Sequence, residues 1–250
     1  MSTQLIESAP VTTRPASRIR SRAGGLAELG PIAAFAVLLV LFAIIAPNFF
    51  TVFNLTNVVR QVSITAIAGV GMTLIILVRG IDLSVGSLAA LTGSLAALSL
   101  AADPAGHSLG GAVLAALLAL AVGAVVGALN GLLVTVAVVP AFIATLATMT
   151  AVRGVALLVT DSSPVSIPDG PYLRIGLGDV FGVPIPVIIM AVVFGLGYLV
   201  LHRMKIGRRI YAVGGNPEAA RLAGIRVNRV LMFVYVFGGI CVAISALILS

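Results

Sequence analysis

The chain has 250 residues, of which 60% are hydrophobic and 9% are charged, and its mean hydropathy is +1.20. Because soluble domains carry about a quarter charged residues, this composition excludes a soluble globular domain and indicates a membrane protein. The formal net charge of +7 comes from basic residues that flank apolar runs, which is typical of membrane topology and argues against nucleic-acid binding.

The chain begins with a polar segment, residues 1–30, which contains four arginines and lacks an apolar core. We therefore expect a retained cytoplasmic tail and not a cleaved signal peptide. Seven apolar runs follow, and about 20 residues of helix cross the roughly 30 Å of a bilayer's hydrocarbon. The predicted spans are 31–47, 58–79, 83–102, 109–131, 141–160, 187–203 and 229–250. They predict an all-α fold, a polytopic transmembrane helix bundle that occupies residues 31–250.

The basic residues orient this bundle, because Lys and Arg concentrate in short cytoplasmic loops. With the N-terminus in the cytoplasm, twelve of the fifteen Lys and Arg residues fall on the cytoplasmic side, seven of them within 203–229. The loop 204–228 is then cytoplasmic and the loop 161–186 is external. The external loop is rich in Pro and Gly, and it is either a simple connection or a surface for a partner.

A polar break separates the second and third spans, with the sequence GIDLSVGS at 80–87. Two interpretations of Asp82 are open. Its carboxylate can cap the helix that follows, where it would accept from free N–H groups at the positive helix end. Alternatively, Asp82 and Ser84 belong to an interrupted helix that exposes polar groups to a translocation pathway.

The fourth span contains Gly123, Gly127 and Gly131 at every fourth position. This spacing places them on one stripe, where a neighbouring helix can approach closely, so we predict a helix-packing surface. Asn130 lies beside the stripe, and its amide either forms an interhelical hydrogen bond or lines a pathway.

The fifth span carries Thr145 and Thr148, which share a face because residues three apart are neighbours on a helix. Their hydroxyls either bond backbone carbonyls of the same helix or line the pathway.

The cytoplasmic loop contains the signals of a short capped helix over 216–224. Asn216 is a suitable N-cap, Pro217 suits the first helical position, Glu218 suits the positive helix end, and Gly224 suits a left-handed stop. Because an isolated two-turn helix is marginal in water, we expect this one to be held by packing against a cytoplasmic partner.

The sequence argues against catalysis and against ATP or metal binding by this chain. Lys205 is the single lysine and is followed by Ile206, so a phosphate-binding loop of the type G-x-x-x-x-G-K-[ST] is absent. His107 and His202 have no Cys or Glu at metal-ligand spacing, and Cys241 lies within an apolar run. We expect neither an enzyme nor a metal or cofactor site. The last apolar run is still apolar at Ser250, so we also expect that the natural chain can continue beyond it.

Four segments resemble a known family. Glu218-Ala219-Ala220 followed by Gly224 is similar to the Glu-Ala-Ala-x-x-x-Gly loop of permease subunits in ATP-binding-cassette (ABC) importers. The segments GIDLSVGS, GALNG at 127–131 and PAFIATLATMTAVRG at 140–154 resemble the sugar (ribose-type) branch of those permeases. Together the four segments span most of residues 60–240, in the family's order.

The resemblance implies a subunit of a bacterial inner-membrane importer for a monosaccharide. Such an importer pairs two permeases, here expected as a homodimer in membrane lipid, with cytoplasmic ATPase subunits that bind ATP and Mg²⁺. A periplasmic or lipid-anchored binding protein delivers the sugar. The family's fold has about ten spans, and its ATPase would dock on Asn216, Pro217, Glu218, Ala219, Ala220, Arg221 and Gly224.

Other solutes stay open within the same superfamily, namely nucleosides, autoinducer-like sugars and branched-chain amino acids. An ion-driven secondary transporter is a rival of another class, although a proton-coupled carrier would usually need more buried carboxylates than this chain has. A structural membrane anchor would leave the signals at Asp82 and Asn216 without a purpose.

Overall fold

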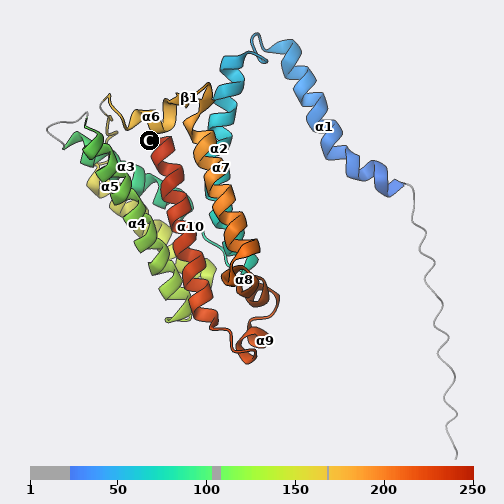
Figure 1. Ribbon diagram of the computed structural model, residues 1–250, viewed down its shortest axis with the longest axis vertical. Helices are drawn as coiled ribbons and strands as arrows, with labels where there is room; N and C mark the ends of the chain where they lie inside the picture. The colour runs from blue at the N-terminus through green and yellow to red at the C-terminus, as the bar shows by residue number, and fades with distance from the viewer. Residues whose placement is uncertain (1–22, 103–107, 168) are drawn as a thin grey trace, which may run out of the picture. The chain divides into compact units, whose positions relative to one another are not determined.

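The computed structural model describes residues 23–102, 108–167 and 169–250, so most of the predicted tail and His107 lie outside the described residues (Figure 1). The chain divides into two compact units, 1–54 and 55–250. In the first unit, α1 (Ala23–Ile45) begins within the predicted tail and leads to a turn before α2 (Val52–Leu77). Asn54 Nδ2 closes this turn by donating to the carbonyl of Phe49 at 2.7 Å.

The second unit is a helix bundle, which confirms the predicted all-α membrane fold. Besides most of α2, its apolar helices are α3 (Val85–Ala101), α4 (Leu109–Thr135), α5 (Ala141–Val159), α7 (Ile185–Tyr198), which continues as the π-helical η1 (Leu199–Arg203), and α10 (Val227–Leu249). Among the described residues, α2, α4, α5, α7 with η1, and α10 are long and apolar enough to cross a membrane, whereas α3 and the apolar part of α1 are shorter. Each predicted span therefore corresponds to a helix.

Helix α10 lies at the centre of the second unit, and it is the most buried of the long apolar helices (Figure 1). On one side it packs against α4 and α3, and α3 also packs against α5. On the other side, Val193 of α7 and Ile67 and Val70 of α2 share an apolar cluster with Cys241 and Ile248 of α10. Gly71 lets α2 approach α10 closely, because a Cβ at this position would lie 2.9 Å from the Cα of Gly238.

The glycine stripe of α4 lies against α10. A Cβ at Gly123 would be 2.6 Å from the carbonyl oxygen of Gly239, and one at Gly127 would overlap the carbonyl of Tyr235. At Gly131 the obstacle would be the Met232 sulfur, 2.8 Å away. The two backbones can approach this closely only because the stripe has no side chains.

The segment 204–228 is more helical than the sequence analysis predicted. Besides the short helix α9 (Pro217–Leu222), it contains α8 (Lys205–Gly215), which the analysis missed. Gly207, Ile210 and Val213 of α8 are buried at a spacing of three, while the arginines between them are exposed. This spacing is the pattern of an amphipathic helix that lies on the bundle.

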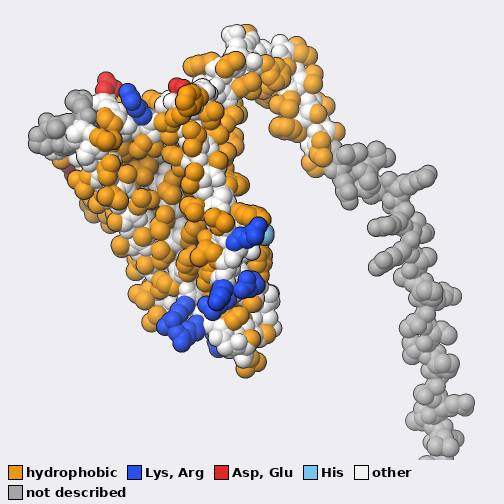
Figure 2. All heavy atoms as spheres, in the orientation of Figure 1, with side chains coloured by type: hydrophobic (Ala, Val, Ile, Leu, Met, Phe, Trp, Pro, Cys, Tyr) orange, Lys and Arg blue, Asp and Glu red, His pale blue; other side chains and the backbone are white. Residues whose placement is uncertain are grey.

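The external loop of the sequence analysis contains α6 (Leu173–Leu177) and a small hairpin, β1 (Asp179–Val180) with β2 (Val183–Pro184). Asp179 pairs with Pro184 and Val180 with Val183 in antiparallel register. We call the end of the second unit that carries α6 and this hairpin the hairpin end, and the end that carries α8 and α9 the basic end. Figure 2 shows most of the Lys and Arg side chains at the basic end. Those of the segment 203–229 are all exposed: Arg203, Lys205, Arg208, Arg209, Arg221, Arg226 and Arg229.

Candidate functional site

The break between α2 and α3 begins with a defined helix stop. The N–H groups of Arg79 and Gly80 donate to the carbonyls of Ile76 and Ile75 at 2.9 and 2.8 Å, and Arg79 adopts a left-handed conformation with φ of +61°. This double hydrogen bond is the arrangement that commonly ends a helix, with glycine as the usual left-handed residue. The chain then runs without regular structure to Ser84.

Asp82 lies in this break at the start of a buried chain of hydrogen bonds. Its Oδ1 accepts from the N–H of Ser84 at 2.8 Å and from Ser84 Oγ at 2.6 Å. Asn130 Nδ2 of α4 in turn donates to Ser84 Oγ at 2.9 Å. We call Asp82, Ser84 and Asn130 the polar cluster. All three are buried, with at most 6% of each residue exposed.

One of the two interpretations of Asp82, that it is the N-cap of the third span, is wrong in position. The helix begins at Val85, Ser84 occupies the cap, and the Ser84 side chain bonds Asp82 and not the helix. The carboxylate accepts the Ser84 N–H ahead of the first turn, because residues 83 and 84, where helix was predicted, have no regular structure. Asn130 does form the interhelical hydrogen bond that one interpretation expected.

Two buried polar atoms beside this cluster have no hydrogen-bond partner within the described residues: Asn130 Oδ1 and the hydroxyl of Tyr235. Tyr235 belongs to α10 and is fully buried. Its hydroxyl would be 2.9 Å from a Cβ at Gly80, so it lies beside the break. Sequence reasoning missed Tyr235, for which the available signal was a lone phenol within an apolar run.

The threonines of α5 bond backbone carbonyls, as one interpretation expected. Thr148 Oγ1 donates to Ala144 O at 3.0 Å, and Thr145 Oγ1 lies 2.8 Å from Ala141 O. Thr145 Oγ1 also lies 3.2 Å from the carbonyl of Ile81, so it ties α5 to the break. Both threonines are buried, and neither lines a cavity at the hairpin end.

Helix α9 has the predicted caps. Asn216 Oδ1 accepts from the N–H groups of Glu218 and Ala219 at 3.0 and 3.1 Å, Pro217 is the first helical residue, and Gly224 has φ of +80°. Ala220 is buried in the cluster formed by α2, α8 and α10, so the helix packs against this chain itself, whereas packing against a cytoplasmic partner was expected.

The exposed surface of α9 consists of Glu218, Ala219, Arg221 and Leu222. Glu218 and Arg221 pair with each other at 2.7 Å, whereas the sequence analysis expected them at an interface. Leu222 is 90% exposed at the end of the helix. The helix therefore presents a short surface with an ion pair and one large exposed apolar side chain.

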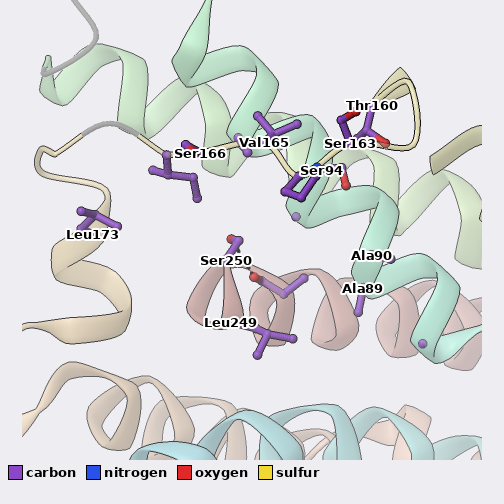
Figure 3. Close-up of a pocket in the computed structure, with 16 residues that line it drawn as sticks. Ala89, Ala90, Ser94, Thr160, Ser163, Val165, Ser166, Leu173, Leu249 and Ser250 are labelled. Atoms are coloured by element: carbon purple, nitrogen blue, oxygen red, sulfur yellow. Dashed lines mark hydrogen bonds between the residues drawn. The ribbon is translucent and has the colours of Figure 1, made fainter. Parts of the chain in front are cut away.

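A cavity of about 770 Å³ opens at the hairpin end, and the sequence analysis did not predict it (Figure 3). One wall is a face of α3 made of small residues, from Gly86 to Ala97. The other walls come from the segment 160–167 and from the end of α10. The hydroxyl side chains that line it are Ser94, Thr160, Ser163, Ser166 and Ser250. Ser250 Oγ also lies 2.8 Å from the hydroxyl of Tyr172.

Comparison with known proteins identifies the family to which this chain is similar. The family described as "Branched-chain amino acid transport system / permease component" matches residues 54–250. The ribose import permease of Escherichia coli K12 is 43% identical over 234 residues, which is 89% of this chain and 69% of that protein. The ribose import permease of Haemophilus influenzae is 40% identical over 229 residues, 90% of this chain and 69% of that protein.

The L-arabinose transport system permease of Escherichia coli K12 is also similar, with 36% identity over 226 residues, 89% of this chain and 66% of that protein. No solved structure matches the chain.

Proposed function

We propose that this chain, which belongs to the branched-chain amino acid transport system / permease component family, forms the membrane pathway for ribose. It is the permease subunit of an ABC sugar importer, a multi-pass inner-membrane transport component and not an enzyme. Ribose is proposed as the solute because the chain is 40% and 43% identical to two ribose import permeases, compared with 36% to the L-arabinose permease. Branched-chain amino acids, which the family's description names, are the second candidate.

The basic end faces the cytoplasm in this proposal. Support comes from the seven exposed Lys and Arg residues of the segment 203–229, because positive charge collects on the cytoplasmic side. The N-terminal tail, 1–30, is then cytoplasmic as well. The hairpin end faces outward, so the cavity between α3 and the segment 160–167 is open to the periplasmic side.

The cavity at the hairpin end is the proposed outer part of the sugar pathway. Hydroxyl side chains can exchange hydrogen bonds with sugar hydroxyls, and the Gly and Ala residues of α3 leave room for a ring. A pathway must bind weakly enough to release its cargo, and a cavity with hydroxyls and without buried charges meets this requirement. The polar cluster of Asp82, Ser84 and Asn130 is the proposed inner part of the same pathway, whereas Thr145 and Thr148 bond backbone carbonyls and line no cavity at the hairpin end.

The family implies two partners, an ATPase and a solute-binding protein. In this proposal the ATPase holds ATP and Mg²⁺, and this chain carries no cofactor of its own. The ATPase receives α9, within the coupling loop 204–228, in a cleft on its surface. Asn216 and Gly224 fix the two ends of α9, and the small side chain of Ala219 permits close contact with the ATPase.

The binding protein docks at the hairpin end. There the turn between β1 and β2 presents Phe181, a fully exposed phenylalanine with φ of +53°, next to Gly182. A second copy of this chain completes the importer within the lipid, as the resemblance of the sequence implies.

Reconstitution tests the proposed solute. Vesicles that contain the permease with its ATPase, supplied with the binding protein, should take up labelled ribose when ATP is present on the cytoplasmic side. Uptake of labelled leucine in place of ribose would favour the second candidate. Uptake of ribose that needs an ion gradient and no ATP would contradict the proposal.

A further inference from the structure

Arg79 connects the end of α2 to the coupling loop. Its guanidinium Nη2 donates to the carbonyl of Gly215 at 2.5 Å, across 136 residues of sequence. Gly215 is the last residue of α8, and the next residue, Asn216, caps α9. A single side chain thus reaches from the break beside the polar cluster to the base of the short helix.

A second contact fixes the same two elements to each other. A Cβ at Gly214 would overlap the carbonyl of Leu77, so the end of α8 lies directly on the backbone at the end of α2. Val213 packs beside this point in one apolar cluster with Val78. The end of α2 and the end of α8 are therefore in direct contact.

The backbone at Arg79 has a conformation that is unfavourable for arginine. Its φ of +61° lies in the left-handed region, where glycine is the residue with the least steric cost. The chain has arginine at this position, and the guanidinium recovers a hydrogen bond from a charged donor to a backbone carbonyl.

The residues that follow Arg79 each contact a different helix. Gly80 lies against the hydroxyl of Tyr235 in α10, and the carbonyl oxygen of Ile81 lies 3.2 Å from Thr145 Oγ1 of α5. Asp82 then reaches Asn130 of α4 through Ser84. A displacement of Arg79 would thus change the distances around Asn130 Oδ1 and the Tyr235 hydroxyl, two buried atoms that have no hydrogen-bond partner among the described residues.

We propose that Arg79 is a positioning residue that links α9 to the polar cluster. Movement of α8 and α9 then shifts the segment 80–84 and gives Asn130 Oδ1 and the Tyr235 hydroxyl new hydrogen-bond partners. The inference rests on the proposed function in one respect, namely that an ATPase moves α9. It adds a route by which this movement reaches the middle of the bundle.

Three variants separate this role from simple stability. Arg79→Gly removes the link and relieves the backbone, so the permease should fold and bind its ATPase normally. Arg79→Lys keeps a positive donor and should retain part of the coupling. The control is Val138→Gly, which relieves a positive φ of +55° at an exposed position between α4 and α5 and breaks no such link.

The first readout is ribose taken up per ATP hydrolysed by reconstituted importer. Arg79→Gly should lower this ratio by about tenfold, the factor that corresponds to one hydrogen bond from a charged donor. Val138→Gly should leave the ratio unchanged, and Arg79→Lys should fall between them. A ratio for Arg79→Gly equal to that of the unaltered chain would overturn the inference.

The second readout does not depend on the solute. In a Cys241→Ala background, a single cysteine replaces Ile81, a residue that is 49% exposed. Its reaction rate with a thiol reagent is measured in the complex with the ATPase. ATP with vanadate should change this rate when Arg79 is present and leave it unchanged in Arg79→Gly. A rate that never responds to nucleotide contradicts the link, whereas a response without ribose uptake supports the link and contradicts the proposed sugar.

Discussion

Gly123→Ala tests the packing of α4 against α10, on which the position of Asn130 depends. The added Cβ would lie 2.6 Å from the carbonyl oxygen of Gly239 and 2.7 Å from the Cβ of Ala243. Ordinary van der Waals contact begins at 3.4 Å, so the helices must separate by about 0.8 Å at this point. A gap of this size forfeits about a quarter to a half of the dispersion energy of each contact that it opens.

The substitution lowers the free energy of unfolding because no side-chain rotation can relieve the clash: one obstacle is a backbone carbonyl and the other is a methyl group. Overpacking of this kind destabilises by about 1–3 kcal/mol. For a chain of this size, each kcal/mol lowers the Tm by about 2–4 °C. The matched control is Gly154→Ala in α5, where a Cβ would have nothing within 4 Å. Alanine there should leave the Tm equal or higher, because it favours helix by about 0.5–1 kcal/mol over glycine.

The chain supplies its own reporter for this measurement. Cys241 is its single cysteine and is 2% exposed, so a thiol-reactive fluorescent dye labels it only as the bundle opens. Dye fluorescence during heating of the detergent-solubilised permease therefore follows unfolding. We expect a clearly lower Tm for Gly123→Ala than for Gly154→Ala. Equal values for the two variants would refute the close approach of α4 and α10.

Three further outcomes are expected. Asn216→Ala removes the cap of α9, worth about 1 kcal/mol, so less ATPase should be retained in a pull-down at equal membrane abundance; full retention would exclude docking at this helix. Asp82→Asn keeps an acceptor for the Ser84 N–H and removes the charge, so we expect normal abundance with reduced ribose uptake, whereas normal uptake would show that the charge is dispensable. In a Cys241→Ala background, a cysteine at Ser163 should react with an impermeant thiol reagent in intact cells and one at Asn216 should not; the reverse pattern would contradict the proposed orientation.

Local features of the structure could be predicted because their causes lie within a few residues. The cap of α9 needs only Asn216, the two N–H groups that follow and Gly224, and these signals are adjacent in the sequence. The apolar helices follow in the same way from run length, although α1 begins earlier than predicted. The amphipathic helix α8 carried a readable pattern at Gly207, Ile210 and Val213, which the basic composition of the segment obscured.

Features that depend on distant segments could not be predicted. Asp82 was recognised as notable, but its partners are set by the approach of Asn130, which lies 46 residues from Ser84 in the sequence. The position of the Tyr235 hydroxyl depends on the absence of a side chain at Gly80, and the hydrogen bond from Arg79 depends on the position of the Gly215 carbonyl. The cavity at the hairpin end is formed by three separate segments, so no single stretch contains its signal.

The most direct test of the central claim is ATP-dependent ribose uptake by vesicles that contain the permease with its ATPase, in the presence of the binding protein. Labelled ribose should accumulate when ATP is present, and it should not accumulate when the ATPase, the binding protein or ATP is omitted. Accumulation that persists without ATP, or that occurs with leucine and not with ribose, would contradict a ribose-importing ABC permease.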